Sequence, residues 1–209
     1  MEFKYYDISP VISSRLAVFP GDATFQRNIS LSFKRGEHLE LSSINTTLHL
    51  GAHADAPNHY NVHGEAIHQR SLSYYYGPAQ VVRVNLNKSE SIVKQHLAAT
   101  EIKASRILFS TDSFPDPEKW NSDFNSLSVE LIEYLFSKNV KLVGIDTPSI
   151  DPETSKELPA HNAIYKNNMA ILEGLILSHV PEGLYQLVAL PLRLEGCDAS
   201  PVRAILVDS

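Results

Sequence analysis

Four residues that can bind a divalent metal stand close together in the segment HLGAHADAPNH, namely His49, His53, Asp55 and His59. On a helix, Asp55 would point away from the first two histidines. Gly51 and Pro57 also disfavour a helix. In an extended chain, by contrast, His49, His53 and Asp55 share one face. Imidazole and carboxylate groups are the usual ligands of catalytic zinc, and manganese accepts them too. The segment therefore predicts a metal site, the alternative being a polar strand edge with solvated histidines.

Glu173 is a second informative residue because it stands in the apolar run MAILEGLIL. A carboxylate that is buried without a partner is strongly disfavoured or stays protonated. We therefore expect a metal to neutralise it, or else one of the arginines Arg193 and Arg203. His161 follows a proline-bearing loop, and by itself it is more typical of a loop residue than of a ligand.

The elements that must position these residues are mostly strands. Alternating or compact apolar segments predict strands over 28–34, 39–50, 80–85, 106–110, 140–146, 185–194 and 202–207. Helices are expected over 91–98 and 128–138, and loops over 114–117 and 147–159. Ser128 is the expected N-cap of the longer helix, whose apolar face comprises Val129, Ile132, Leu135 and Phe136. The order of strand, helix and strand over 106–146 favours a parallel crossover. We predict an α/β protein, with a mixed sheet and few helices, in one domain over residues 1–209.

The composition narrows the class of protein. The formal net charge is -6, and there are no basic runs, which argues against a nucleic acid or an anionic membrane as partner. No apolar stretch is long enough to span a bilayer, and the N-terminal segment does not resemble a secretory signal. The single cysteine, Cys197, cannot form a disulfide within the chain. These features predict a cytoplasmic enzyme.

The metal-binding segment resembles the H-x-G-T-H-x-D-x-P-x-H signature of the cyclase family of metal-dependent amidohydrolases. Further segments resemble the formamidase branch of that family: YYDISP at 5–10, FPGD at 19–22, GIDTPSIDPETSKELPAH at 144–161, AILEG at 170–174 and ALPLRLEGCDASPVRAIL at 189–206. The resemblance covers nearly the whole chain. It implies the family's swivelling β/β/α domain, assembled as a homodimer or a larger homo-oligomer.

The resemblance also implies two divalent metal ions per subunit, with zinc favoured and manganese as the alternative. His49, His53 and Asp55 would bind one ion. Asp55 would bridge to a second ion, which His161 and Glu173 would also bind. A metal at this place would explain the buried carboxylate of Glu173.

The implied reaction is hydrolysis of the small molecule N-formyl-L-kynurenine to L-kynurenine and formate, a step of tryptophan breakdown. A metal-activated water would attack the formyl carbon. His59 would be the catalytic acid–base group, and Phe19 would belong to the wall that binds the aryl ring.

Three residues depart from the family's pattern. Ala52 stands where the wider family has Thr, Phe19 where the branch often has Trp, and Asn162 where a second His is frequent. None of them removes an expected ligand. Two other functions stay open: hydrolysis of another aryl amide or of a lactam such as isatin, and a non-catalytic metal-binding domain.

Overall fold

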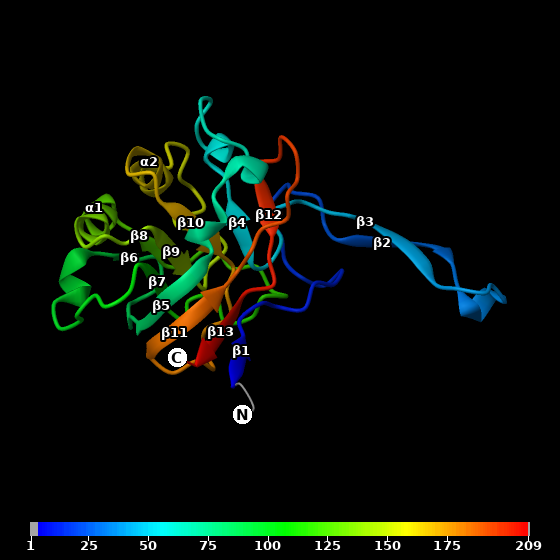
Figure 1. The fold of residues 1–209 in the computed structure, drawn as a ribbon, viewed down its shortest axis with the longest axis horizontal. Helices are drawn as coiled ribbons and strands as arrows, with labels where there is room; N and C mark the ends of the chain where they lie inside the picture. Colours follow the sequence, from blue (N-terminus) through cyan, green and yellow to red (C-terminus); the bar gives the residue numbers. More distant parts are fainter. Residues whose placement is uncertain (1–3, 209) are drawn as a thin grey trace.

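A nine-stranded sheet forms the centre of the computed structural model, which describes residues 4–208 (Figure 1). The strand order is β1-β13-β11-β5-β7-β9-β10-β4-β12. These strands are β1 (Tyr5–Asp7), β4 (His53–Asp55), β5 (Tyr76–Arg83), β7 (Arg106–Ser110), β9 (Leu142–Ile145), β10 (Ala170–Glu173), β11 (Gly183–Val188), β12 (Ala199–Pro201) and β13 (Ile205–Asp208). The neighbours β5, β7, β9 and β10 run parallel, and the remaining pairs are antiparallel.

The other elements in the described residues are short. Two α-helices, α1 (Val129–Ser137) and α2 (Pro159–Lys166), lie side by side against the sheet in Figure 1. Five 3-10 turns are η1 (Phe33–Arg35), η2 (Pro57–His59), η3 (Ile67–Gln69), η4 (Leu72–Tyr74) and η5 (Lys94–Leu97). Two small sheets pair β2 (Gln26–Leu31) with β3 (Leu41–Asn45), and β6 (Ser91–Ile92) with β8 (Ser126–Leu127). The predicted mixed sheet with few helices is confirmed.

The two faces of the sheet are buried in separate apolar clusters. On β7, Ile107 and Phe109 face the cluster that contains the buried apolar residues of both helices, while Leu108 faces the opposite cluster. On β10, Ile171 and Leu172 alternate in the same way. Because a strand alternates with a period of two, burial on both faces makes these strands continuous apolar runs. A continuous run of this kind marked residues 106–110 in the sequence, and β7 has the predicted bounds.

Helix α1 begins as predicted, because the hydroxyl of Ser128 accepts a hydrogen bond from the backbone N–H of Leu131. The predicted apolar face was partly wrong. Leu131, Ile132 and Leu135 are buried, whereas Val129 and Phe136 are exposed. The helix is therefore rotated so that a stripe including Leu131 meets the core.

The predicted helix over 91–98 is also wrong. Ser91 and Ile92 form β6, which pairs with β8, and only η5 follows. The buried ladder with β8 competes successfully with a weak local helix tendency, an example of tertiary contacts overriding propensity.

The hairpin β2–β3 extends away from the rest of the protein (Figure 1). Its strands end earlier than predicted. Ser32 caps η1, and its hydroxyl donates to Glu40. After Asn45 the chain leaves the strand and bends towards His49.

No helix within residues 4–208 combines the length and the apolar composition needed to cross a membrane.

Candidate metal centre and pocket

The antiparallel pairing of β4 with β10 creates the centre of the site. Its register places His53 opposite Glu173 and Asp55 opposite Ile171. Side chains of directly opposed residues point to the same face. His53, Asp55 and Glu173 are each only 2% exposed. Two segments far apart in the sequence thus bring one imidazole and two carboxylates into a buried position.

His49 reaches this group by a bend and not along the strand. The extended arrangement predicted over 49–55 holds only for β4, which begins at His53. Gly51 has a φ of +58°, a backbone conformation that favours glycine. A Cβ atom on Gly174 would lie 2.1 Å from the carbonyl oxygen of Gly51, so glycine at 174 permits this close approach. The bend leaves Nδ1 of His49 at 3.0 Å from Oδ1 of Asp55.

His161 enters from the first turn of α2, which the sequence analysis did not predict. Pro159 at the start of the helix was the available signal, because proline is favoured in a first turn. The carboxylate of Asp151 accepts hydrogen bonds from the backbone N–H groups of Ala160 and His161. The helix start is therefore fixed by a buried acid in the preceding loop.

The distances between candidate ligand atoms match those of a metal polyhedron. Nε2 of His53 lies 3.4 Å from Oδ1 of Asp55 and 3.2 Å from Oε2 of Glu173. Nε2 of His161 lies 3.4 Å from Oδ2 of Asp55 and 3.5 Å from Oε1 of Glu173. Tetrahedral bonds of about 2.0–2.1 Å separate ligand atoms by roughly 3.3–3.4 Å. Oδ1 of Asp55 therefore faces His53, and Oδ2 of the same carboxylate faces His161.

Buried atoms without hydrogen bonds show that these residues fit a metal. Nε2 of His53 and both carboxylate oxygens of Asp55 make no hydrogen bond to any residue in 4–208. Such buried polar atoms are disfavoured unless an ion or water contacts them. Among the described residues, two compact groups could hold an ion, one formed by His53, Asp55 and Glu173 and the other by His49, Asp55 and His59. Both contain Asp55, so the geometry accommodates a bridging carboxylate.

Hydrogen bonds on the far side of each ring orient the histidines. Nδ1 of His53 lies 2.8 Å from the carbonyl oxygen of Gly51 and donates to it. Nδ1 of His161 lies 2.7 Å from Oδ2 of Asp151. Both rings therefore present Nε2 to the carboxylates, which is the arrangement usual for metal-binding histidines.

The pKa shifts follow from this crowding of charges. Burial alone would lower the pKa of His49, but Asp55 and Asp198 raise it to about 10. Burial would also lower the pKa of His53, but the neighbouring carboxylates of Asp55 and Glu173 outweigh it and raise the pKa to about 9. The histidines in turn hold the pKa of Asp55 well below its usual value, although burial opposes this. A metal that binds here must displace protons from the imidazoles.

The two arginines considered as partners of Glu173 lie elsewhere. Arg203 makes an ion pair with Asp7, and Arg193 is exposed. The protein groups next to the Glu173 carboxylate are His53, His161 and the backbone N–H of Ile150, which donates at 2.7 Å. The arginine alternative is therefore wrong.

His59 is the last residue of the 3-10 turn η2 and lies at the solvent-exposed edge of the candidate ligand group. Its ring centroid lies 4.1 Å from that of His49 and 6.2 Å from that of His161. About a third of its side chain (34%) is exposed. It is thus the most accessible of the six polar residues predicted for the site.

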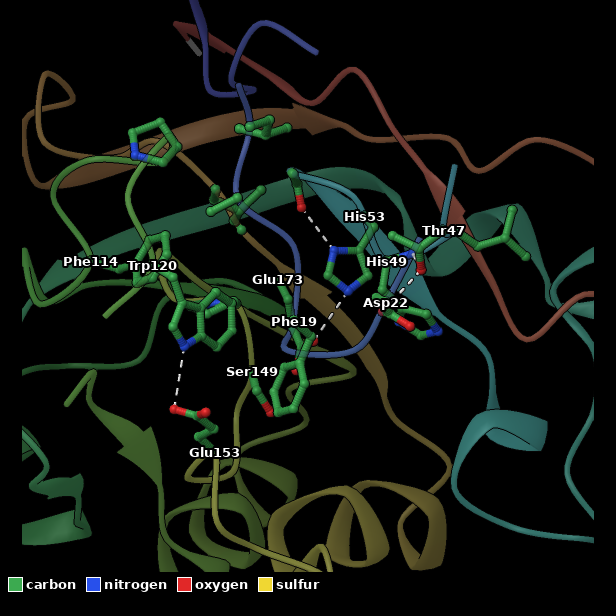
Figure 2. A pocket seen from close by; sticks show the side chains of 18 of the residues that line it. Phe19, Asp22, Thr47, His49, His53, Phe114, Trp120, Ser149, Glu153 and Glu173 are labelled. Carbon is green, nitrogen blue, oxygen red and sulfur yellow. Dashed lines mark hydrogen bonds and ion pairs between the residues drawn. The ribbon is translucent and has the colours of Figure 1, made fainter. Parts of the chain in front are cut away.

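A pocket of about 600 Å³ opens beside these residues. Phe19 lines it, and its ring meets Trp120 edge to face at a centroid distance of 5.2 Å (Figure 2). Phe114 contacts the other side of Trp120, whose indole N–H points to Glu153 at 3.4 Å. Trp120 and Phe114 were not predicted from the sequence, because a single aromatic residue in a loop carries no local signal of its neighbours. No lysine or arginine of the described chain lines the pocket.

The departures from the family's pattern leave the polar group intact. Ala52 is buried among apolar residues behind β4. Asn162 points outward, and its side-chain amide donates to the carbonyl oxygen of Glu157.

Comparisons with known proteins agree with one another. A family model named Cyclase ("Putative cyclase") matches residues 6–152. The chain is 41% identical over 204 residues to a protein of Bordetella petrii named kynurenine formamidase, covering 97% of each chain. A solved structure described as a "Potential Metal-Dependent Hydrolase With Cyclase Activity" is 28% identical, has a TM-score of 0.86 and covers 100% of this chain and 99% of its own. Isatin hydrolase A from Labrenzia aggregata shares the fold with a TM-score of 0.84 at 20% identity, over 99% and 94% of the two chains.

Proposed function

The chain belongs to the cyclase family of metal-dependent hydrolases, and on this premise we propose that it hydrolyses N-formyl-L-kynurenine to L-kynurenine and formate. The observation that carries the proposal is the group of ligand atoms around Asp55, which opens into a pocket with an aromatic wall. The relatives named kynurenine formamidase match over nearly the whole length of this chain, which supports the same substrate.

We assign five residues to the metal centre. One ion would be held by His49, His53 and Asp55, and a second by Asp55, His161 and Glu173. Five carboxylates and no lysine or arginine line the pocket in the described chain, a lining that suits divalent cations. Zinc suits imidazole and carboxylate ligands best, and manganese is the alternative. When bound, such ions supply hydroxide at neutral pH and polarise a carbonyl group.

The remaining residues orient the substrate and move protons. The edge-to-face pair of Phe19 and Trp120 offers an apolar surface on which the substrate's aryl ring rests. Water adds to the formyl carbon, and the bond from that carbon to the aniline nitrogen breaks. His59 accepts the proton that the water loses and returns it to the departing nitrogen. Its place at the edge of the group and its exposure suit this role.

The test is the rate of N-formyl-L-kynurenine hydrolysis by purified protein before and after chelation. We expect fast turnover that a chelator abolishes and that zinc or manganese restores. Absence of turnover with either metal would rule out this substrate. Tight metal binding without hydrolysis of any aryl amide would favour a non-catalytic metal-binding domain.

Hydrolysis of a lactam such as isatin is the second enzymatic candidate, because isatin hydrolases share this fold. At 20% identity the likeness speaks for the fold alone. A panel that contains N-formyl-L-kynurenine, isatin and a simple formanilide decides between the two. A higher kcat/KM for isatin would replace the proposed substrate.

We also propose that the protein assembles as a homodimer or a larger homo-oligomer through the β2–β3 hairpin. The hairpin exposes apolar side chains, with Ile29 at 48%, Phe33 at 63% and Ile44 at 64% exposed. An isolated two-stranded hairpin is marginal in water, so contact with a second copy would stabilise it. Light scattering of the intact protein and of an Ile44→Lys variant tests the assembly.

A cytoplasmic location stays a prediction, for which fractionation of the source cells is the test.

A further inference from the structure

Asp198 lies where the sheet brings a loop against the metal centre. It directly precedes β12, in which Ala199 pairs with Asp55. The backbone N–H of Ala56 donates to the carbonyl oxygen of Asp198 at 2.8 Å. The backbone of residue 198 is thus fixed to the end of the strand that carries His53 and Asp55. These backbone contacts fix the position from which the Asp198 side chain extends.

A single oxygen of this carboxylate contacts two histidines. Oδ2 of Asp198 lies 3.0 Å from Nε2 of His49 and 3.5 Å from Nδ1 of His59. The first distance is that of a hydrogen bond, and the second is that of an ion pair. Within residues 4–208, no other acidic residue lies in ion-pair range of His59.

We propose, on the basis of the function proposed above, that Asp198 is a positioning residue that fixes the tautomer and the ring orientation of both His49 and His59. By accepting the Nε2–H of His49, it leaves Nδ1 of that ring free to face Asp55 and a metal. By facing Nδ1 of His59 at ion-pair distance, it favours the tautomer with its proton on Nδ1 and leaves Nε2 of that ring free to accept a proton from water. The carboxylate also stabilises the His59 imidazolium that forms between the two proton transfers.

The other two histidines of the centre have equivalent partners. The carbonyl oxygen of Gly51 accepts from His53, and Asp151 accepts from His161. Asp198 completes this pattern for His49. Asp146, another carboxylate that lines the pocket, is not a substitute. Its oxygens accept from the hydroxyl and backbone N–H of Thr111 and from the backbone N–H of Asp112.

The test compares Asp198→Asn and Asp198→Ala with Glu195→Gln, a control that changes an exposed carboxylate in the same loop. Zinc affinity of the metal-free proteins is measured by competition with a chelating dye. It should fall about 10–100-fold in both Asp198 variants, the usual effect of losing an outer-shell partner. With saturating zinc, kcat should fall about 100-fold while KM changes little. The control should match the wild type in both measurements.

A double-mutant cycle with His59→Ala separates positioning from a general structural role. If Asp198 acts on kcat through His59, adding Asp198→Asn to His59→Ala should lower kcat by less than about twofold further. A full multiplicative loss would overturn the assignment to His59. Zinc affinity equal to that of the wild type would overturn the assignment to His49.

Failure of this proposal can be told apart from failure of the proposed reaction. If the wild type does not hydrolyse N-formyl-L-kynurenine, the reaction is wrong, but the zinc affinities still decide whether Asp198 positions His49. If the wild type is active and Asp198→Asn keeps its kcat, its KM and its zinc affinity, Asp198 has no positioning role. Circular dichroism and melting temperature show whether each variant is folded, and Asp198→Ala serves if Asp198→Asn is not.

Discussion

Oδ2 of Asp151 lies 2.7 Å from Nδ1 of His161 and 3.1 Å from the backbone nitrogen of the same residue. One buried acid therefore both caps α2 and orients the ring that α2 carries into the centre. The start of a helix and the direction of a candidate ligand depend on the same carboxylate.

Replacing Asp151 should weaken metal binding and the fold together. In Asp151→Ala we expect zinc affinity to fall about 10–100-fold, because the His161 ring loses its partner. Loss of the cap should cost roughly 0.5–2 kcal/mol of unfolding free energy. Dye competition and urea unfolding measure the two effects. Asp151→Asn, which retains one acceptor oxygen, should be less affected in stability, and an unchanged zinc affinity in both variants would contradict the orienting role.

Glu173→Ala should lose bound metal and stability together. The change leaves His53 and His161 buried without their shared carboxylate, and breaking a buried ionic pair costs about 3–5 kcal/mol. Metal content by atomic emission and the unfolding free energy are the measurements. Glu173→Gln keeps the shape of the side chain and should lose metal with a smaller loss of stability. Full metal content in both variants would show that Glu173 is not a ligand.

His59→Ala should keep its metal and lose turnover. We expect kcat to fall about a hundredfold or more, the usual scale for an acid–base group. His63→Ala, which changes an exposed neighbouring histidine, is the control. A variant with normal kcat would exclude the acid–base role. Loss of metal would instead make His59 a ligand, which its distance from His49 and Asp55 allows.

Phe19→Ala should weaken substrate binding more than catalysis. Removing one ring of the aromatic pair leaves Trp120 with less apolar surface beside the substrate, so KM should rise about tenfold while kcat changes less. Phe136→Ala, on the exposed face of α1, is the matched control. Phe19→Trp should remain active. A normal KM for Phe19→Ala would remove this residue from the binding wall.

The metal-free protein should lose stability as the pH rises. The pKa of His49 is raised from 6.5 to about 10 and that of His53 from 6.5 to about 9 in the folded state. Their contribution is therefore complete below the unfolded pKa of 6.5 and is lost as the pH rises through about 9 and 10. Calorimetry of the chelated protein should show a falling melting temperature above pH 6.5.

A His49→Gln, His53→Gln double variant is the control for this pH dependence. Its melting temperature should vary less over the same range, because neither replacement titrates. Zinc affinity of the wild type should change in the opposite direction and become tighter with rising pH, since zinc competes with protons for the same nitrogens. A melting temperature of the chelated wild type that is constant between pH 6.5 and 9 would contradict the expected linkage.

Local patterns in the sequence were enough to predict several parts of the structure. Period-two alternation places His53 and Asp55 on one face, and they share one face of β4. The run at Arg106–Ser110 is a strand, and Ser128 caps α1. The apolar surroundings of Glu173 predicted a buried carboxylate that needs neutralising. Each of these follows from neighbours within a few positions, where alternation, capping and burial are set by the local chain.

The tertiary structure alone decided which distant groups meet. The register of β4 on β10 sets His53 against Glu173, and the register of β12 on β4 brings Asp198 to the site. Trp120 joins Phe19 across a long stretch of sequence. Strand register and loop docking depend on burial shared by the whole sheet, and a short segment of sequence does not contain that information. The sequence by itself therefore determined the kinds of ligand and the local elements, while packing of the two sheet faces decided their partners.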